Sequence, residues 1–420
     1  MKPAGLFALV FAVVCSAQQQ SWRAQGQALK AKGDAAGAAA AFEKAAEAEP
    51  AAADLRDEIG FVFAVQGRQD EAIRRFDEAI ALDPKFAPAH YHLGVARWLR
   101  KEPDAAVRSA REAVRLDPRN GEYRYRLGSM LYDTNHLEEA LPELETAVKL
   151  SPRRAEIWNQ LGLARQGLGN LTGARDAYAK AVELQPASND YRNSFGFLLI
   201  DTGAAKEGFA QFQAVLKRDP SNRAALINTG YAYLRTGDYD KAVELFQKLL
   251  DGGATDAVIH YDLALALKQK DRLDDAITHF HEALRLEPAM VEAWYTLGIT
   301  TWQNGDFEAT ITAMRNATRL RPAYAEAHYM LGTALRQTGK LTEAAASLEE
   351  AIRLNPTTPG PYNTLAQVRR AQGDNDAAQK LLAQAAEVKK KLEADQANRL
   401  KTMGPSTRET PSLPHLPGPR

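Results

Sequence analysis

Residues 158–186 read WNQLGLARQGLGNLTGARDAYAKAVELQP, and this stretch holds one full copy of a pattern that recurs along the chain. A leucine and a glycine at 161–162 precede a second glycine at 169, and Ala174 comes before the closing Pro186. Proline cannot continue a helix, and glycine suits the turn between two helices. The stretch therefore predicts a pair of helices that are joined by a short turn and that end at the proline.

The same residue types return every 34 residues. The prolines of this series are Pro50, Pro84, Pro118, Pro152, Pro186, Pro220, Pro288, Pro322 and Pro356. Small residues recur in the first helix, at Gly26, Gly60, Gly94, Gly128, Gly162, Gly196, Gly230, Ala264, Gly298, Gly332 and Ala366. Mostly large apolar residues recur in the second helix, at Phe42, Phe76, Ala110, Leu144, Tyr178, Phe212, Phe246, Phe280, Met314, Leu348 and Leu382. We expect the small residues to let the two helices of each pair approach closely.

This spacing resembles the tetratricopeptide repeat, whose pattern is W-x2-L-G-x2-Y followed by A-x3-F, A and P. The resemblance covers residues 19–392, which is eleven units of 34 residues. It implies an all-α fold, a right-handed superhelical solenoid of antiparallel helix pairs. One helical hairpin cannot bury its apolar face alone, so we expect the core to form between neighbouring units.

The first residues are typical of a signal peptide, which we predict for residues 1–17. Lys2 precedes an apolar run that is too short to span a bilayer, and small residues follow it. We therefore expect an exported protein, periplasmic or secreted, with no transmembrane segment in the mature chain. Two alternatives stay open: a buried first helix, and a lipoprotein acylated at Cys15, although Val14 stands where lipoprotein signals usually carry a small residue.

The far end departs from the 34-residue pattern. Lys390 stands at the proline position, so the last helix is predicted to continue as a cap over residues 393–403. Residues 404–420 are rich in proline, serine and threonine, and we predict a disordered tail there. Residues 252–254 interrupt the proline series with Gly-Gly-Ala, which indicates either a tolerated change in a turn or a joint that divides the array.

Composition excludes several classes of function. Lys and Arg number 53 and Asp and Glu also 53, so no overall charge favours nucleic acid as a partner. Cys15 is the only cysteine, which rules out an internal disulfide framework. Glycines follow the 34-residue period and form no phosphate loop, and histidines two residues apart on a helix face different sides. We predict no enzyme activity, no cofactor site and no metal site.

A candidate binding groove is predicted from the first helices. In each unit, positions 2, 5, 9 and 12 lie away from the apolar stripe, and in the family that this chain resembles they line a concave groove. Aromatic and amide side chains are frequent there, and both suit an interface. The predicted groove residues are Phe61, Tyr91, Trp98, Tyr125, Tyr132, Asn159, Asn193, Phe197, Asn228, Tyr231, Tyr261, Tyr295, Trp302, Tyr329 and Asn363.

The sequence thus predicts a non-enzymatic scaffold that binds extended protein or peptide segments outside the cytoplasm. Carbohydrate binding is the alternative function, because aromatic side chains also stack on sugar rings. In that case the protein would be a cell-wall or polysaccharide-binding accessory subunit of an envelope export or pilus assembly machine. Packing of the same aromatics against the next helix is the competing structural interpretation for each residue.

Overall fold

The computed structural model describes residues 22–402, and within that range the chain consists of helices joined by turns. The signal peptide predicted for 1–17 and the tail predicted for 404–420 lie outside the described residues. We call each 34-residue unit counted from residue 19 a hairpin and number its positions from 1. The first helices are 22–31, α3 (Ala53–Val65), α5 (Ala87–Leu99), α7 (Gly121–Asp133), α9 (Ala155–Gly167), α11 (Asn189–Asp201), α13 (Arg223–Thr236), α15 (Ala257–Gln269), α17 (Val291–Gln303), α19 (Ala325–Gln337) and α21 (Pro359–Ala371).

The second helices complete the hairpins and keep the same register. They are α2 (Ala35–Ala48), α4 (Gln69–Leu82), α6 (Pro103–Leu116), α8 (Leu137–Leu150), α10 (Leu171–Leu184), α12 (Ala205–Leu216), α14 (Tyr239–Asp251), α16 (Leu273–Leu286), α18 (Phe307–Leu320), α20 (Leu341–Leu354) and α22 (Asn375–Thr402). Every first helix from α3 onward begins at position 1, and every second helix begins at position 17. The period read from the prolines therefore fixes the boundaries of the helices.

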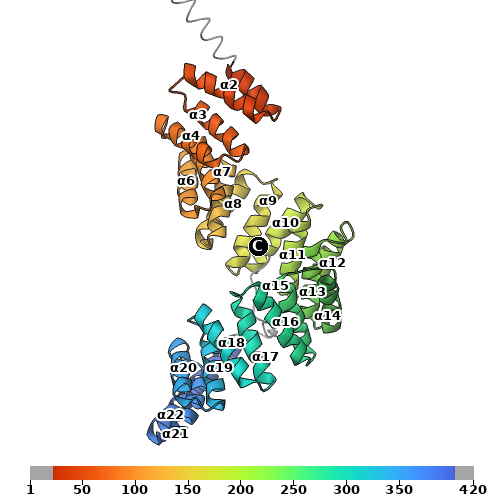
Figure 1. The fold of residues 1–420 in the computed structure, drawn as a ribbon, viewed down its shortest axis with the longest axis vertical. Coiled ribbons are helices and arrows are strands. Elements are labelled where there is room, and N and C mark those ends of the chain that lie inside the picture. The colour runs from red at the N-terminus through yellow and green to blue at the C-terminus, as the bar shows by residue number, and fades with distance from the viewer. Residues whose placement is uncertain (1–21, 403–420) are drawn as a thin grey trace, which may run out of the picture. The chain divides into compact units, whose positions relative to one another are not determined.

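The chain forms two compact units, one ending at Val215 and one beginning at Leu216. Within each unit, consecutive helices pack side by side, as Figure 1 shows. The division does not fall at 252–254, where the sequence left a joint open. There α14 packs on α15, and one buried cluster includes both Phe246 and Ile259, so the core of the C-terminal unit continues across the Gly-Gly turn.

The small residues of the first helices form the closest contacts inside a hairpin. The glycine at position 8 lies under the large side chain at position 24: a Cβ built on Gly162 would meet the ring of Tyr178 at 2.6 Å, and one on Gly230 would meet Phe246 at 2.5 Å. Both large side chains are fully buried. The predicted close approach of the two helices is confirmed, and it excludes any side chain at these glycines.

The turn between the helices uses a left-handed residue at position 15. Glycine occupies this position in most hairpins, for example Gly237 with φ 79°. Lys101, Asn135 and Asp271 stand at the same position and adopt φ of 61°, 61° and 59°. A left-handed conformation strains residues other than glycine, so these three turns keep their shape because the packing of the helices requires it.

A repeated hydrogen bond joins most hairpins to the one before. The side chain at position 4 reaches back to the carbonyl oxygen six residues earlier, as when Trp158 Nε1 donates to Pro152 at 2.9 Å. Seven hairpins share this bond, through His90, Arg124, Trp158, Arg192, Trp294, His328 and Tyr362. Each of these carbonyls belongs to a proline of the 34-residue series.

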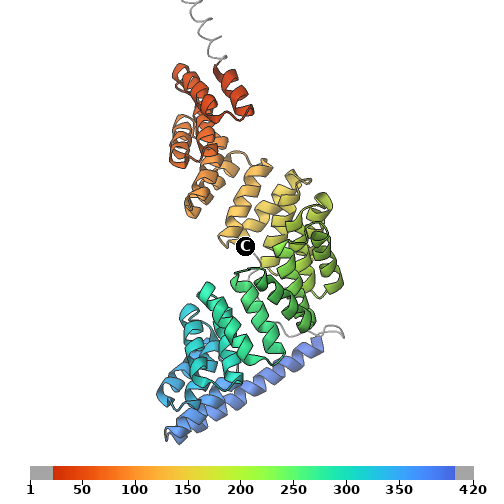
Figure 2. The ribbon, with the colours of Figure 1, turned by 45° about the vertical axis from the view of Figure 1, so that its right-hand side comes forward.

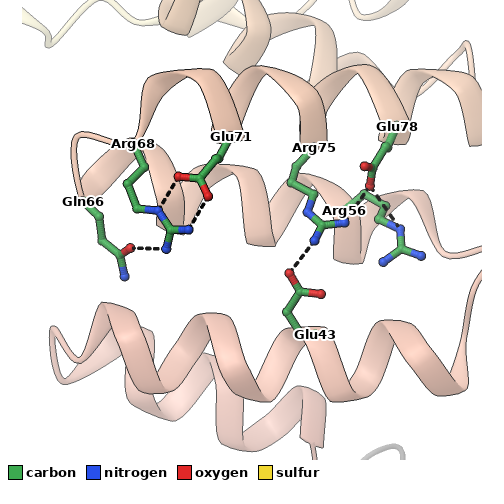
Figure 3. A network of polar contacts seen from close by, with 7 residues as sticks. All are labelled: Glu43, Arg56, Gln66, Arg68, Glu71, Arg75 and Glu78. Atoms are coloured by element: carbon green, nitrogen blue, oxygen red, sulfur yellow. Dashed lines mark hydrogen bonds and ion pairs between the residues drawn. The ribbon is translucent and has the colours of Figure 1, made fainter.

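Ion pairs add contacts between successive second helices at the surface. In Figure 3, Arg75 of α4 bonds Glu43 of α2 at 2.6 Å and Glu78 of its own helix at 2.9 Å. Arg56 of α3 lies 3.7 Å from Glu78. At the start of α4, Arg68 pairs with Glu71. Exposed pairs of this kind contribute about 0–1 kcal/mol each, so they align helices more than they stabilise them.

The last helix is the longest of the described helices. Figure 2 shows α22 extending well beyond the second helices that precede it in the C-terminal unit. It contains 28 residues and ends at Thr402, where the sequence predicts a cap that ends at residue 403. Ala385 is buried, whereas Leu392 is 39% exposed, so only the first turns of α22 cover the array.

Candidate interaction surface

The predicted groove residues differ widely in exposure. We call the side chains at positions 2, 5, 6, 9 and 12 of the first helices the first-helix face. Asn363 is exposed, whereas Asn193, Asn228 and Tyr261 are buried. The other residues are partly buried: Phe61, Tyr91, Trp98, Tyr125, Tyr132, Asn159, Phe197, Tyr231, Tyr295, Trp302 and Tyr329. The surface is thus a mixture of packed and accessible side chains, and the residues of the two units are described separately.

Tyr261 does not lie at the surface, and its prediction as an exposed anchor is wrong. Its side chain is 0% exposed, with the ring edge-on to Phe280 at 5.8 Å between centroids. Its hydroxyl lies 3.5 Å from Thr296 Oγ1 of the next first helix. Burial raises the pKa of Tyr261 above its ordinary value. Position 5 points toward the following hairpin, which here covers the ring completely.

In the N-terminal unit, Tyr91 is part of a bonded cluster between α5 and α7. Its ring stacks on Tyr123 at 4.8 Å, and its hydroxyl donates to Glu122 at 2.9 Å. Burial, and then the charge of Glu122, raise the pKa of Tyr91 to about 12. Burial of Glu122 opposes its ionisation, but hydrogen bonds from Arg154, Tyr91 and Arg126 outweigh it and lower the pKa of Glu122. The cluster is held together without a partner.

Tyr125 is a further partly buried aromatic ring beside this cluster. Its ring lies between two guanidinium groups, 5.5 Å from Arg126 and 5.3 Å from Arg154. Both arginines also pair with Glu122. Arginine held flat against a ring presents both an aromatic face and charge-assisted donors to a ligand.

In the C-terminal unit, the aromatic residues of hairpin 9 pack in a similar way. Tyr295 and Tyr324 lie 4.8 Å apart, and Arg321 lies over Tyr324 at 5.1 Å while bonding Glu292 at 2.6 Å. Burial raises the pKa of Tyr324 to about 12. Tyr295 thus packs against the last residue of its own hairpin, which caps the N-terminus of α19.

Buried polar atoms without hydrogen-bond partners set part of this face apart from an ordinary core. In the N-terminal unit these are Ser129 Oγ, Asn159 Oδ1 and Asn193 Oδ1, which come from hairpins 4, 5 and 6 in order; no described residue bonds them. A buried polar atom left unpaired costs about 1–3 kcal/mol. No hydrogen-bond donor among the described residues pairs with these three atoms, so packing of the chain alone does not account for their burial.

The C-terminal unit carries two more such atoms, Asn228 Nδ2 and Asp262 Oδ1, at position 6 of neighbouring hairpins. Asp262 is 2% exposed, and burial raises its pKa to about 8. Neither Ser129 nor Asp262 is among the residues predicted from the sequence. A signal for Asp262 was present, because it is the only acidic residue in the apolar stretch AVIHYDLALAL at 257–267.

A small cavity opens on the face of hairpins 1 to 3. It has a volume of about 290 Å³ and is lined by Phe42, Leu55 and several charged side chains. Those charges are already paired, since His92 Nδ1 lies 2.8 Å from Asp57 and Arg23 bonds both Glu49 and Asp54. Across residues 22–402, no three His, Cys, Asp or Glu side chains gather closely enough to enclose a metal ion. Within the same range, none of the helices combines the length and the apolar character needed to cross a membrane.

Comparison of the sequence with protein families gives matches over most of its length. Residues 133–258 match the family described as cytochrome c-type biogenesis protein H TPR domain. Residues 101–145, 261–309 and 295–359 match a family described as tetratricopeptide repeat, and residues 335–402 match a second family with that description. Residues 62–99 match the family described as TPR repeat. No curated protein sequence matches the chain.

Solved structures show the same fold. A tetratricopeptide repeat protein from Parabacteroides merdae ATCC 43184 is 15% identical, has a TM-score of 0.54, and covers 59% of this chain and 98% of its own. YrrB, described as a TPR protein with an unusual peptide-binding site, is 24% identical with a TM-score of 0.42, over 45% of this chain and 97% of its own. The Pseudomonas aeruginosa protein pilF is 23% identical with a TM-score of 0.42, over 47% of this chain and 90% of its own.

Proposed function

Because this chain is a tandem tetratricopeptide-repeat protein, a family of protein-interaction scaffolds, we propose that it binds an extended segment of another protein on its first-helix face. The observation that carries this proposal is the row of unpaired acceptors, Ser129 Oγ, Asn159 Oδ1 and Asn193 Oδ1, in three successive hairpins. Backbone N–H groups of an extended segment are donors at regular intervals, whatever its sequence. These atoms are buried, so the side chains would have to turn outward for the segment to bond them.

The neighbouring side chains favour such a segment further. Tyr125 with Arg126 and Arg154 lies one hairpin before Asn159, and Phe197 lies on the same helix as Asn193. Partly buried aromatic rings beside polar atoms are the usual composition of interface anchors. We infer that the asparagine amides of this chain hydrogen-bond the main chain of the bound segment, while the aromatic rings contact the segment's side chains.

The acceptor row gives a direct test. The full chain is screened against an array of 15-residue peptides, and the peptides it binds are titrated against the double variant Asn159→Ala, Asn193→Ala. Two lost hydrogen bonds of about 1 kcal/mol each predict roughly a 30-fold lower affinity. The thermal midpoint should stay unchanged or rise, because the substitutions also remove unpaired buried atoms.

Asn363→Ala is the matched control, since Asn363 has the same position 5 but an exposed side chain. It should bind the selected peptides as the unaltered chain does. Equal affinity for the double variant would sink the proposed peptide mode. Retention of the chain on polysaccharide beads, without peptide binding, would favour the glycan-binding alternative instead.

We propose further that the protein works outside the cytoplasm. Support comes from the charged start, the short apolar run and the small residues of positions 1–17. Expression of the full chain with a C-terminal tag should give a mature form that begins at residue 18, recovered from the periplasm or the medium. Mass spectrometry of the N-terminus measures this, and an intact Met1 on cytoplasmic protein would refute it.

A further inference from the structure

Hairpin 8 differs from the seven hairpins in which the position-4 side chain bonds a proline carbonyl. Ala254, in the Gly252-Gly253-Ala254 turn, stands where each of those seven is preceded by proline. The position-4 residue is His260, and its Nδ1 lies 3.0 Å from Nδ1 of His279 on α16. The two imidazole rings are 5.3 Å apart between centroids and 30° from parallel. His260 thus contacts another histidine, whereas its counterparts in those seven hairpins contact a backbone carbonyl.

Two Nδ1 atoms this close direct their lone pairs at a common point. Only one of them carries a hydrogen in the neutral pair, so the contact is a single N–H···N bond. Zinc bound tetrahedrally at 2.0–2.1 Å separates two nitrogen ligands by about 3.3 Å. The two rings therefore need to move apart by only a few tenths of an ångström to accept an ion in place of the shared hydrogen.

The surroundings suit such an ion. Both histidines are partly buried. Asp275 and Glu282 face the pair with negative charge, against Arg272 and Arg285. Arg285 Nε holds Glu282 at 2.8 Å, so this carboxylate adds charge nearby without joining the ligands.

We propose that His260 and His279 bind one divalent transition-metal ion of the zinc type, with water completing its coordination. Imidazole nitrogen is a preferred ligand for such ions. The ion would connect α15 to α16 and so hold together the two helices of hairpin 8. The site lies at positions 4 and 23, apart from the first-helix face, and does not depend on the proposed peptide binding.

The chain contains its own comparison sites. His90 and His328 also occupy position 4, and each has a glutamate and an arginine in the arrangement of Glu282 and Arg285. Both bond a proline carbonyl through Nε2, and position 23 is serine in their hairpins, Ser109 and Ser347. They lack only the second histidine.

Isothermal titration of the full chain with Zn²⁺ tests the site, using His279→Ser and, as an independent second variant, His260→Arg. Serine and arginine stand naturally at these positions in other hairpins, so the fold should be kept, which circular dichroism checks. We expect each variant to bind the ion at least tenfold more weakly, and the double control His90→Ala, His328→Ala to stay within twofold of the unaltered chain. The proposal would be overturned if the unaltered chain bound no zinc, if either His279→Ser or His260→Arg bound it as tightly as the unaltered chain, or if the double control lost binding.

Discussion

Replacing Phe246 with alanine is expected to lower the free energy of unfolding around hairpin 7 by about 3–5 kcal/mol. The ring is fully buried and lies directly on Gly230, where no side chain fits. Alanine would remove the contacts of the ring and leave a cavity, because a glycine opposite has nothing to fill it.

Stacked hairpins unfold partly independently, so the decrease in the free energy of unfolding should be largest in hairpin 7 and its neighbours. Hydrogen exchange of the amides in α13 to α16 is the measurement. Leu382→Ala is the control, because Leu382 has the same position 24 in the last hairpin but is 40% exposed. It should cost less than about 1 kcal/mol. Similar losses at the two sites would mean that the glycine contact does not anchor the hairpin.

Replacing Asp262 with asparagine is expected to stabilise the C-terminal unit at neutral pH, by about 4 kcal/mol. The pKa of Asp262 is about 8 in the folded chain, against an ordinary value of 3.8. A carboxyl whose pKa rises on folding favours the folded state when protonated. Its contribution is therefore most favourable below about pH 4 and declines as pH rises toward 8. Asparagine keeps the shape of the protonated acid but never ionises.

The difference between the two proteins should accordingly depend on pH. Thermal unfolding at intervals from pH 4 to 9 should show nearly equal midpoints at the acidic end and a growing advantage for the variant up to pH 8. Asp251→Asn, at an exposed carboxylate, should leave the profile unchanged. A variant that is less stable than the unaltered chain at every pH would show that the carboxylate has a partner in solution.

The fold could be predicted from the sequence almost residue by residue. Helix starts depend on local features, such as the proline of the 34-residue series and the turn residue at position 15, and both are legible without a structure. Lys101 is an exception, because its residue type does not predict a left-handed backbone. Only the packing of its hairpin explains its positive φ.

The candidate surface could be predicted only in part. Helical periodicity places Tyr91, Tyr261 and Asn193 on one face, but it does not say how deeply the next hairpin covers them. Tyr261 is buried because Thr296 and Phe280 close over it, and that depends on residues 19 to 35 positions away. The unpaired state of Asn159 Oδ1 likewise depends on what lies around it, so the row of acceptors emerges only in three dimensions.

The bond from position 4 to the preceding proline also bears on how such a chain changes length. The donor and the acceptor lie on opposite sides of a hairpin boundary, and seven boundaries use the same acceptor. A gene that gained or lost one whole unit by recombination would recreate the bond at the new boundary, with the helices still in register. The boundary at Ala254 is different, because there the position-4 side chain, His260, contacts His279 of its own hairpin. Hairpin 8 moved elsewhere would carry its histidine pair with it, so the seven boundaries that share the bond are those where the number of hairpins is freest to vary.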